Sequence, residues 1–431
     1  MTSPRDFLEH LFRIAIAAAH PSRCLPHLLP DAPRSGRLIL LAAGKAAGSM
    51  AEVAEAHYLD GGFPQSRLSG IAVARHGYGR PLRVIDMVEA GHPVPDQAGL
   101  DATARTLALA DDATPDDLVL VLMSGGASAN WIAPAQGLSL ESKQAVNRAL
   151  LRSGASIGEI NTVRKHLSRI KGGRLARHAF PAQVVTIGIS DVPGDDPAVI
   201  GSGPTVPDPT TLAEARAIVA GYRLGLPDNV VAALNDDANE SPKPHDPAFR
   251  ANRYHLAARP IDAFKAAEAE IRAAGFDCIF LGDRVEGEAR VVAAEQAALA
   301  CDLKAQGRRA VILSGGELTV TIRGNGRGGP NQEFALALAA ELDGVSGIAA
   351  LAADTDGTDG GAGSADDPAG AYVDGGSASR ARSLGLDPAQ SLADNNSTAF
   401  FAVLNDLIKP GPTFTNVNDF RAIMVNHIDT A

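Results

Sequence analysis

A lysine in a glycine-rich segment near the start of the chain has neighbours that suit the binding of an anion. Lys45 follows Gly44 directly and is otherwise surrounded by small residues. A cation at the start of a helix opposes the helix dipole, so an anionic ligand would compensate it. The segment is not a Walker A loop, because Ile39 and Ala46 stand where that motif needs Gly and Ser or Thr. Lys45 is therefore a candidate catalytic residue, with a solvated surface lysine as the alternative.

A second small-residue segment follows the apolar run that ends at residue 123. The backbone N–H groups of such a loop, with two serine hydroxyls, suit phosphate or carboxylate binding. A plain tight turn is the alternative. The candidate substrate- and phosphate-binding residues here are Gly44, Ser124, Gly125, Gly126 and Ser128.

A carboxylate, Asp191, follows another apolar run and precedes a long segment of glycine and proline. A carboxylate in that place could orient or deprotonate a hydroxyl, or hold Mg²⁺. We take Asp191 as a candidate catalytic residue and expect Asp195 and Asp196 to be turn or cap residues.

The segment Gly324–Gly329 satisfies G-x-G-x-x-G, a pattern that predicts a dinucleotide site when it joins a strand to a helix. However, Arg327 lies inside the turn and Glu333 lies in the first turn of the following helix, where it would oppose a pyrophosphate. An arginine on a glycine loop suits the clamping of a transferring phosphoryl group. We therefore favour phosphoryl transfer over NAD binding and take Arg327 as catalytic. The candidate binding residues nearby are Asn325, Gly326 and Asn331.

Three aspartates, Asp354, Asp356 and Asp359, fall within six positions after an apolar run. Such a density of charge is costly without a cation or abundant water. The spacing fails the EF-hand pattern, because Ala365 stands where that motif needs Glu. We predict Mg²⁺ bound together with phosphate and keep a solvated Asp-rich loop as the alternative. Glu317 is a further candidate ligand of the metal or of the substrate.

The elements that must position these residues follow from apolar runs that alternate with helical patterns after a first amphipathic helix. Strands are predicted at 37–41, 71–74, 84–88, 118–123, 183–189, 278–281, 310–313, 318–322 and 348–353. Helices are predicted at 45–57, 100–110, 139–152, 157–169, 261–274, 286–306 and 332–342. This alternation is typical of parallel sheets covered by helices, in which ligands lie beyond the carboxyl ends of the strands. A polar stretch at 236–250, with three prolines in six residues, divides the chain into predicted α/β domains at 1–238 and 252–431.

The composition of the chain argues against several classes of protein. The 431 residues carry a formal net charge of −11, which argues against a nucleic-acid binder. The three cysteines are widely spaced and support neither a disulfide scaffold nor a zinc site, and no apolar run is long enough for a membrane helix. The histidines lack paired metal spacing and are expected to be structural. The basic run at 164–177 is expected to face water, with steering of an anion as the alternative. We predict a soluble, cytoplasmic protein.

The segments GKAAGSM, MSGGASANW, NTVRKHLSRIKGGRLA, SDVPGDDPAVIGSGPT, LSGGELTVTIRGNGRGGPNQEFALA, ADTDGTDG, DNNSTAFF and GPTFTNVNDF together resemble the glycerate 2-kinase family with a C-terminal MOFRL domain. The resemblance runs from about Phe7 to Val425, and the MOFRL region covers about 309–420. It implies a Rossmann-like N-terminal domain, a smaller α/β C-terminal domain and an active site in the cleft between them. The lysine and arginine proposed as catalytic in that family fall on Lys45 and Arg327.

The resemblance also implies a reaction: transfer of the γ-phosphate of ATP to the 2-hydroxyl of D-glycerate with Mg²⁺, giving 2-phosphoglycerate. Phosphoryl transfer needs alignment, Mg²⁺ and fixed positive charge, which agrees with the candidate residues. The expected partners are therefore ATP and D-glycerate, and a homodimer is left open. Members of the family are often labelled hydroxypyruvate reductase, so an NAD(P)H-dependent reductase is the alternative, followed by a non-catalytic nucleotide sensor.

Overall fold

The computed structural model describes residues 3–361 and 364–426, which form two compact units. Unit 2 is Pro21–Ala257. Unit 1 takes its described residues from Met1–His20 and Ala258–Ala431. The domain limits of 1–238 and 252–431 stay a prediction. In the structure, the first helix makes its contacts with the second half of the chain and belongs to the same unit.

Unit 2 is built on a six-stranded sheet of order β3-β2-β1-β4-β5-β6, and the pairings from β3 to β5 are parallel. Every residue of β1 and β4 is buried, as expected of central strands covered on both faces. The strands are β1 Leu38–Ala43, β2 Leu68–Arg75, β3 Asp86–Ala90, β4 Leu118–Met123, β5 Gln183–Ile189 and β6 Arg253–Ala258. The first five were predicted; β6 was not.

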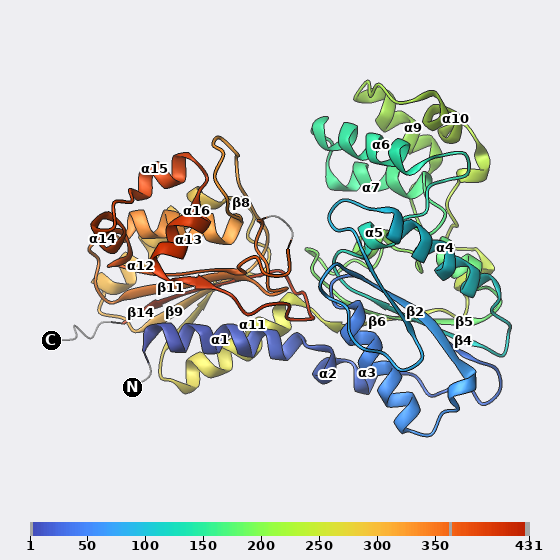
Figure 1. The fold of residues 1–431 in the computed structure, drawn as a ribbon, viewed down its shortest axis with the longest axis horizontal. Helices are drawn as coiled ribbons and strands as arrows, with labels where there is room; N and C mark the ends of the chain where they lie inside the picture. Colours follow the sequence, from blue (N-terminus) through green and yellow to red (C-terminus); the bar gives the residue numbers. More distant parts are fainter. Residues whose placement is uncertain (1–2, 362–363, 427–431) are drawn as a thin grey trace. The chain divides into compact units, whose positions relative to one another are not determined.

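Helices cover this sheet, and a group of them forms a core of its own. The helices that accompany the strands are α2 Pro21–Cys24, α3 Ala47–Asp60, α4 Gln97–Asp111, α5 Ala127–Asn130 and α8 Arg174–Ala179. The separate group consists of α6 Leu140–Arg152, α7 Ile157–His166, α9 Leu212–Gly221 and α10 Asp228–Leu234, which share a buried apolar cluster. Figure 1 shows these four helices together above the sheet of the unit.

The expectation that the basic run at 164–177 faces water is confirmed for Arg169 and Arg177, which are exposed, and wrong for most of the run. Lys165, His166 and Lys171 are buried, and the Arg174 guanidinium donates to the backbone oxygens of Lys165 and Asn239. Helix α7 packs against α6 and α9, and its basic side chains reach side-chain oxygens of neighbouring segments, among them those of Asp208 and Glu240. Sequence position alone did not reveal this, because α9 and α10, which help to cover α7, were not predicted.

Unit 1 has a mixed six-stranded sheet of order β13-β12-β11-β14-β9-β7. Strands β7 and β9 are parallel, while β14 runs antiparallel to both β9 and β11. The strands are β7 Asp277–Phe280, β9 Ala310–Ser314, β11 Ile348–Asp354, β12 Gly370–Asp374, β13 Leu407–Ile408 and β14 Asp419–Val425. The predicted strand at 318–322 is shorter than expected: β10 is Leu318–Thr319 and forms a two-stranded sheet with β8 Gly287–Glu288.

Two layers of helices cover the sheet of unit 1 (Figure 1). Helix α1 packs on α11 through Phe7 and Phe276, whose ring centroids are 5.6 Å apart. Helices α12 and α13 cover the opposite face, and nearly all of α13 is buried. The helices are α1 Pro4–Ala19, α11 Pro260–Ala273, α12 Ala289–Ala305, α13 Pro330–Glu341, α14 Ser377–Ser383, α15 Pro388–Ala393 and α16 Ser397–Leu404.

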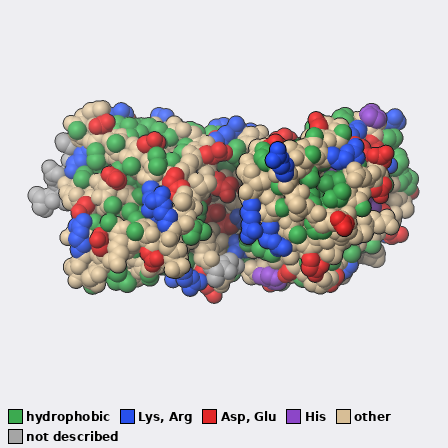
Figure 2. All heavy atoms as spheres, turned by 90° about the horizontal axis from the view of Figure 1, so that it is seen from above, with side chains coloured by type: hydrophobic (Ala, Val, Ile, Leu, Met, Phe, Trp, Pro, Cys, Tyr) green, Lys and Arg blue, Asp and Glu red, His purple; other side chains and the backbone are tan. Residues whose placement is uncertain are grey.

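Charged side chains of both signs are scattered over the face of each unit seen in Figure 2. Within residues 3–361 and 364–426, no helix combines the length and the apolar character needed to cross a membrane.

Candidate active site

The parallel register of unit 2 brings three of the predicted turns to one edge of its sheet. Ala43 at the end of β1 pairs with Met123 at the end of β4, and Met123 pairs in turn with Gly188 near the end of β5. The residues that follow these strands include Lys45, Ser124 and Asp191. This edge is where ligands of parallel α/β sheets bind.

The turn after β1 is built against the turn after β4. The Lys45 N–H donates to the carbonyl oxygen of Gly125 at 2.8 Å, and the Ala46 N–H donates to Ser124 Oγ at 2.9 Å. Gly44 has a φ of +117°, and a Cβ on it would lie 2.4 Å from Ser124 Oγ. Gly44 is therefore required for this close approach, and the fully buried Ser124 hydroxyl holds the Lys45 turn in place.

The side chain of Lys45 passes beside Gly126 and His92. A Cβ added to Gly126 would lie 3.4 Å from Lys45 Cγ and 3.1 Å from His92 Nε2. Gly126 has a φ of +86°, so both its conformation and its surroundings favour glycine. His92, which was expected to be structural, thus lies at the candidate site. Its position shortly after β3, on the same sheet edge, was the signal that could have indicated it.

Ser128 belongs to a different group of contacts from Ser124. Its Oγ lies 2.8 Å from Lys171 Nζ and 3.0 Å from Ser202 Oγ. The sequence placed Lys171 in a basic run and Ser202 in the glycine and proline segment after Asp191, but it linked neither to Ser128, because they are 43 and 74 positions away from it.

Asp191 lies half-exposed just beyond β5, where the sequence predicted it. The neighbouring residues are turn residues, as expected: Asp195 has a φ of +58°, and Asp196 Oδ1 accepts the Ala198 N–H at 2.8 Å. Asp191 is thus the first carboxylate after the strand.

In unit 1 the glycine segment 324–329 is held by the residues just before α16. Asn395 Oδ1 accepts the N–H groups of Arg323, at 2.7 Å, and Gly324, at 3.1 Å. Asp394 accepts those of Asn325, at 2.9 Å, and Gly326, at 2.8 Å. Asn396 Oδ1 accepts the Arg327 N–H at 3.3 Å. Five consecutive N–H groups therefore end on three residues, Asp394, Asn395 and Asn396, which we call the 394–396 clasp.

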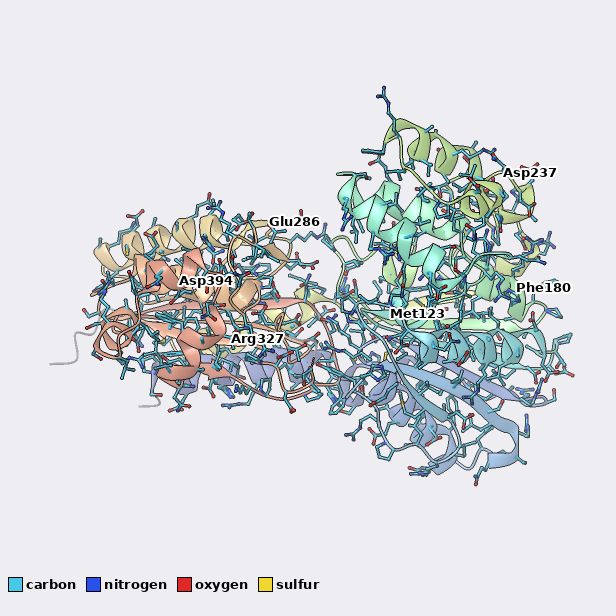
Figure 3. The ribbon with its side chains drawn as sticks, turned by 45° about the horizontal axis from the view of Figure 1, so that its top comes forward. Met123, Phe180, Asp237, Glu286, Arg327 and Asp394 are labelled. Atoms are coloured by element: carbon cyan, nitrogen blue, oxygen red, sulfur yellow. The ribbon has the colours of Figure 1, made fainter. Side chains whose placement is uncertain are left out.

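The glycines of this segment allow close contact with the clasp. A Cβ on Gly324 would lie 2.3 Å from Asp394 Cα, and one on Gly326 would lie 2.4 Å from Asn396 Cβ. The glycines therefore face protein backbone, whereas the glycines of a dinucleotide loop face a pyrophosphate. Arg327, labelled in Figure 3 with Asp394, is exposed. The clasp was not recognised as a site element, although its residues lie in one of the motifs that carry the family resemblance.

The first turn of α13 is capped by a buried carboxylate. Asp359 accepts the backbone N–H groups of Asn331 and Gln332 at 3.0 and 2.9 Å, and the Asn331 side-chain amide donates to both Asp359 and Asp419. Burial, aided by the charge of Asp419, raises the pKa of Asp359 to about 7, although the N–H donors oppose this shift. The N-terminus of α13 is thus occupied by protein, which again argues against a pyrophosphate there.

The four predicted Mg²⁺ ligands are placed differently from one another. Asp359 uses both carboxylate oxygens in the helix cap, and Asp356 Oδ1 accepts from the N–H and hydroxyl of Thr358. Asp354 ends β11, and Glu317 is exposed after β9. In the described part of the chain, no three His, Cys, Asp or Glu side chains are grouped so that they could hold a metal ion. These residues do not fit a protein-built Mg²⁺ cage, and the ligand set stays a prediction.

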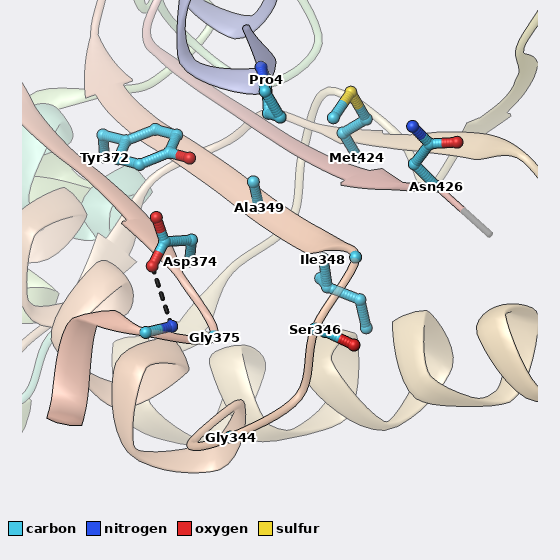
Figure 4. A pocket seen from close by; sticks show the side chains of 12 residues that line it. Pro4, Gly344, Ser346, Ile348, Ala349, Tyr372, Asp374, Gly375, Met424 and Asn426 are labelled. Atoms are coloured by element: carbon cyan, nitrogen blue, oxygen red, sulfur yellow. Dashed lines mark hydrogen bonds between the residues drawn. The ribbon is translucent and has the colours of Figure 1, made fainter. Parts of the chain in front are cut away.

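A pocket of about 540 Å³ lies in unit 1 at the opposite edge of the sheet (Figure 4). It is lined by Tyr372, Asp374 and Met424, among others, and Asp374 Oδ1 accepts the Gly376 N–H at 2.9 Å. None of the predicted site residues lines it.

Comparison with known proteins extends over nearly the whole chain. A model described as a domain of unknown function (DUF4147) matches residues 7–235, and the MOFRL family model matches residues 310–419. A D-glycerate 2-kinase of Thermotoga maritima is 38% identical, covering 94% of both chains. A putative hydroxypyruvate reductase of Agrobacterium vitis is 46% identical over 98% of this chain and 95% of its own.

The solved structures agree with the sequence relatives. The crystal structure of a glycerate kinase from Thermotoga maritima has a TM-score of 0.84 with this chain at 37% identity, covering 97% of this chain and 99% of its own. The matched family models, the kinase relatives and the shared fold lead to one conclusion: the chain belongs to the glycerate 2-kinase family with a MOFRL domain, a family of kinases.

Proposed function

We propose that this chain transfers the γ-phosphate of ATP to the 2-hydroxyl of D-glycerate. The kinase relatives support the acceptor, since those from Thermotoga maritima and Pyrococcus horikoshii are named for glycerate phosphorylation. The observation that carries the proposal in this chain is the 394–396 clasp. It occupies the N–H groups that a dinucleotide loop would offer to a pyrophosphate and leaves the Arg327 side chain exposed.

Lys45 and Arg327 are the proposed catalytic cations. Charge develops on the transferred phosphoryl group and on the leaving oxygen, and fixed cations aimed at those atoms stabilise the transition state. The backbone of Lys45 is fixed by its bonds to the Ser124–Gly125 turn, and the backbone of Arg327 by the clasp. Both residues thus have the rigid backbone that positioning requires.

Asp191 is the proposed group that orients the acceptor hydroxyl or removes its proton, because it is the first carboxylate beyond β5 on the sheet edge that carries Lys45. The loop from Ser124 to Ser128 would bind anionic oxygens of the substrates. Mg²⁺ usually keeps several waters and binds through substrate phosphates with one or two carboxylates. A Mg²⁺ ion that arrives with ATP therefore agrees better with the scattered aspartates of unit 1 than a pre-built site does.

The test compares two reactions of one preparation. Purified protein is mixed with D-glycerate, ATP and Mg²⁺, and separately with hydroxypyruvate and NADH or NADPH. ADP formation that depends on glycerate, without oxidation of the nicotinamide, is the expected result. Hydroxypyruvate-dependent oxidation of NADH or NADPH without phosphorylation would contradict the proposal and favour the activity for which the Agrobacterium vitis relative is named.

A further inference from the structure

Lys171 is a buried lysine that reaches the loop after β4 from the segment between α7 and α8. The residue is 2% exposed. Its Nζ lies 2.6 Å from the carbonyl oxygen of Ser128 and 2.8 Å from Ser128 Oγ. Across residues 3–361 and 364–426, no carboxylate forms an ion pair with this ammonium, whose hydrogen bonds both end on Ser128. Burial, with the nearby charges of Arg164 and Lys143, lowers the pKa of Lys171.

Ser128 is also held from a second direction. Ser202 Oγ lies 3.0 Å from Ser128 Oγ, and Ser202 has a φ of +65°, a left-handed conformation that is uncommon for serine. The Gly172 N–H donates to the Ser202 carbonyl oxygen at 3.0 Å. The segment that carries Lys171 therefore fixes both the Ser202 turn and Ser128. A strained backbone held by several contacts is typical of functional sites.

The direction of the Ser128 hydroxyl proton follows from these contacts. A hydroxyl has one proton and two acceptor lone pairs. When Lys171 donates to Ser128 Oγ, the Ser128 proton must point elsewhere, to Ser202 or to an oxygen of a ligand. An ammonium buried without a carboxylate is costly, and an anion bound at Ser128 would offset that cost.

We propose that Lys171 is a positioning residue that acts through Ser128 on anionic oxygens of a substrate. Two groups share this chemistry: the phosphates of ATP and the carboxylate of glycerate. The identity of the two substrates rests on the proposed function, whereas the contact between Lys171 and Ser128 does not.

The chain offers a matched control in Lys143. It is 1% exposed, burial also lowers its pKa, and its Nζ donates to the carbonyl oxygens of Arg164 and Leu167, both at 2.9 Å. Lys143 thus supplies a second buried ammonium in the same unit whose hydrogen bonds do not reach Ser128. Lys143→Met and Lys171→Met remove comparable side chains, and only the second removes the support of Ser128.

The experiment measures the dissociation constants of ATP with Mg²⁺ and of D-glycerate, each alone, by calorimetry on the full chain. We expect Lys171→Met to weaken at least one of them by about tenfold or more, since a hydrogen bond to a charged group is lost. Lys143→Met should change both by less than about twofold. If only the affinity for ATP falls, the phosphates are the group that Ser128 binds. If only the affinity for glycerate falls, the carboxylate is that group. Equal effects of the two variants, or no effect of Lys171→Met, would overturn the proposal.

A double-mutant cycle checks that the effect passes through Ser128. If it does, the double variant Ser128→Ala with Lys171→Met weakens binding no more than the worse of the two single variants. If the two residues act independently, the fold losses in affinity of the single variants multiply in the double variant. Multiplied losses would overturn the proposal. If Lys171→Met does not fold, Ser202→Ala serves instead. Ser202→Ala should weaken the binding of the same substrate as Ser128→Ala does. If neither serine variant weakens the binding of ATP or of D-glycerate, the proposal is overturned. Turnover assayed in parallel tests the proposed function separately, because binding does not require turnover.

Discussion

At the scale of single residues, the account depends on two cations that the sequence made visible. Lys45 and Arg327 stand out because each lies in a glycine-rich segment. Their supports were not visible in the same way. Ser124 and Asn395 reach Ala46 and Arg323 across 78 and 72 positions of the chain, and such contacts leave no local pattern in the sequence.

Substitution of either cation should slow turnover much more than it affects folding. We expect Lys45→Ala and Arg327→Ala each to lower kcat about 100- to 1,000-fold, since loss of a group that stabilises developing charge costs about 2.7 to 4 kcal/mol. Steady-state kinetics and thermal unfolding of each variant provide the measurement. Arg323→Ala removes another exposed arginine near the same glycine segment and should retain activity. Near-normal kcat in Arg327→Ala would remove that residue from the mechanism.

At the scale of elements, strands that are unbroken apolar runs were predictable, whichever way they pair, and most strands with interrupted runs were not. Strand β11 was predicted, although its neighbours β12 and β14 are both antiparallel to it. Strands β1, β4 and β5 are nearly pure apolar runs. Strand β14 escaped prediction because Asp419 and Arg421 interrupt its apolar run, and these two form a buried ion pair at 2.8 Å. The glycine segment matches a dinucleotide motif in the sequence, because the pattern records glycines but not what they face. The fold shows that these glycines face the 394–396 clasp.

The clasp should control the segment that carries Arg327. Asn395→Ala removes the acceptor for two backbone N–H groups, and we expect a loss of stability of about 1 to 3 kcal/mol together with a lower kcat. Denaturant unfolding and kinetics measure the two effects. Asp387→Ala removes a comparable acceptor at the start of α15, which bonds the Ala389 N–H and none of the N–H groups of the glycine segment, so it should reduce stability without the kinetic loss. Equal kcat in the two variants would contradict this role of the clasp.

The cap of α13 should make stability depend on pH. The pKa of Asp359 is raised from 3.8 to about 7, so the folded state holds the proton more tightly than the unfolded state. The stabilisation is fully present below pH 3.8 and is lost as the pH rises towards 7, by roughly 4 kcal/mol at most. Unfolding measured between pH 4 and pH 8 with a chelator should show this decline, and Asp359→Asn should lack it. The same slope in both proteins would exclude Asp359 as its source.

At the scale of the whole molecule, the first helix belongs to the unit formed by the second half of the chain. Phe12 is 2% exposed, and its ring centroid lies 5.9 Å from that of Phe420 in β14. The sequence predicted the helix from its amphipathic pattern. It did not predict the partner, because nothing local links residue 12 to residue 420.

Phe12→Ala should therefore destabilise unit 1. Truncation of a buried phenylalanine costs about 3 to 5 kcal/mol. Limited proteolysis should show earlier cleavage within Ala258–Ala431 than within Pro21–Ala257. Phe180→Ala is the control, because Phe180 lies in unit 2 and is 52% exposed. Earlier cleavage of unit 2 in the Phe12 variant would contradict the assignment of α1.

The central claim is that this chain phosphorylates the 2-hydroxyl of D-glycerate, and ³¹P NMR of the reaction with ATP and Mg²⁺ tests it most directly. The spectrum identifies both the product and the position of the new phosphate. The account predicts the resonance of 2-phosphoglycerate with the wild-type protein and its near absence with Arg327→Ala. Formation of 3-phosphoglycerate, or ATP that remains intact while hydroxypyruvate is reduced under parallel conditions, would contradict it.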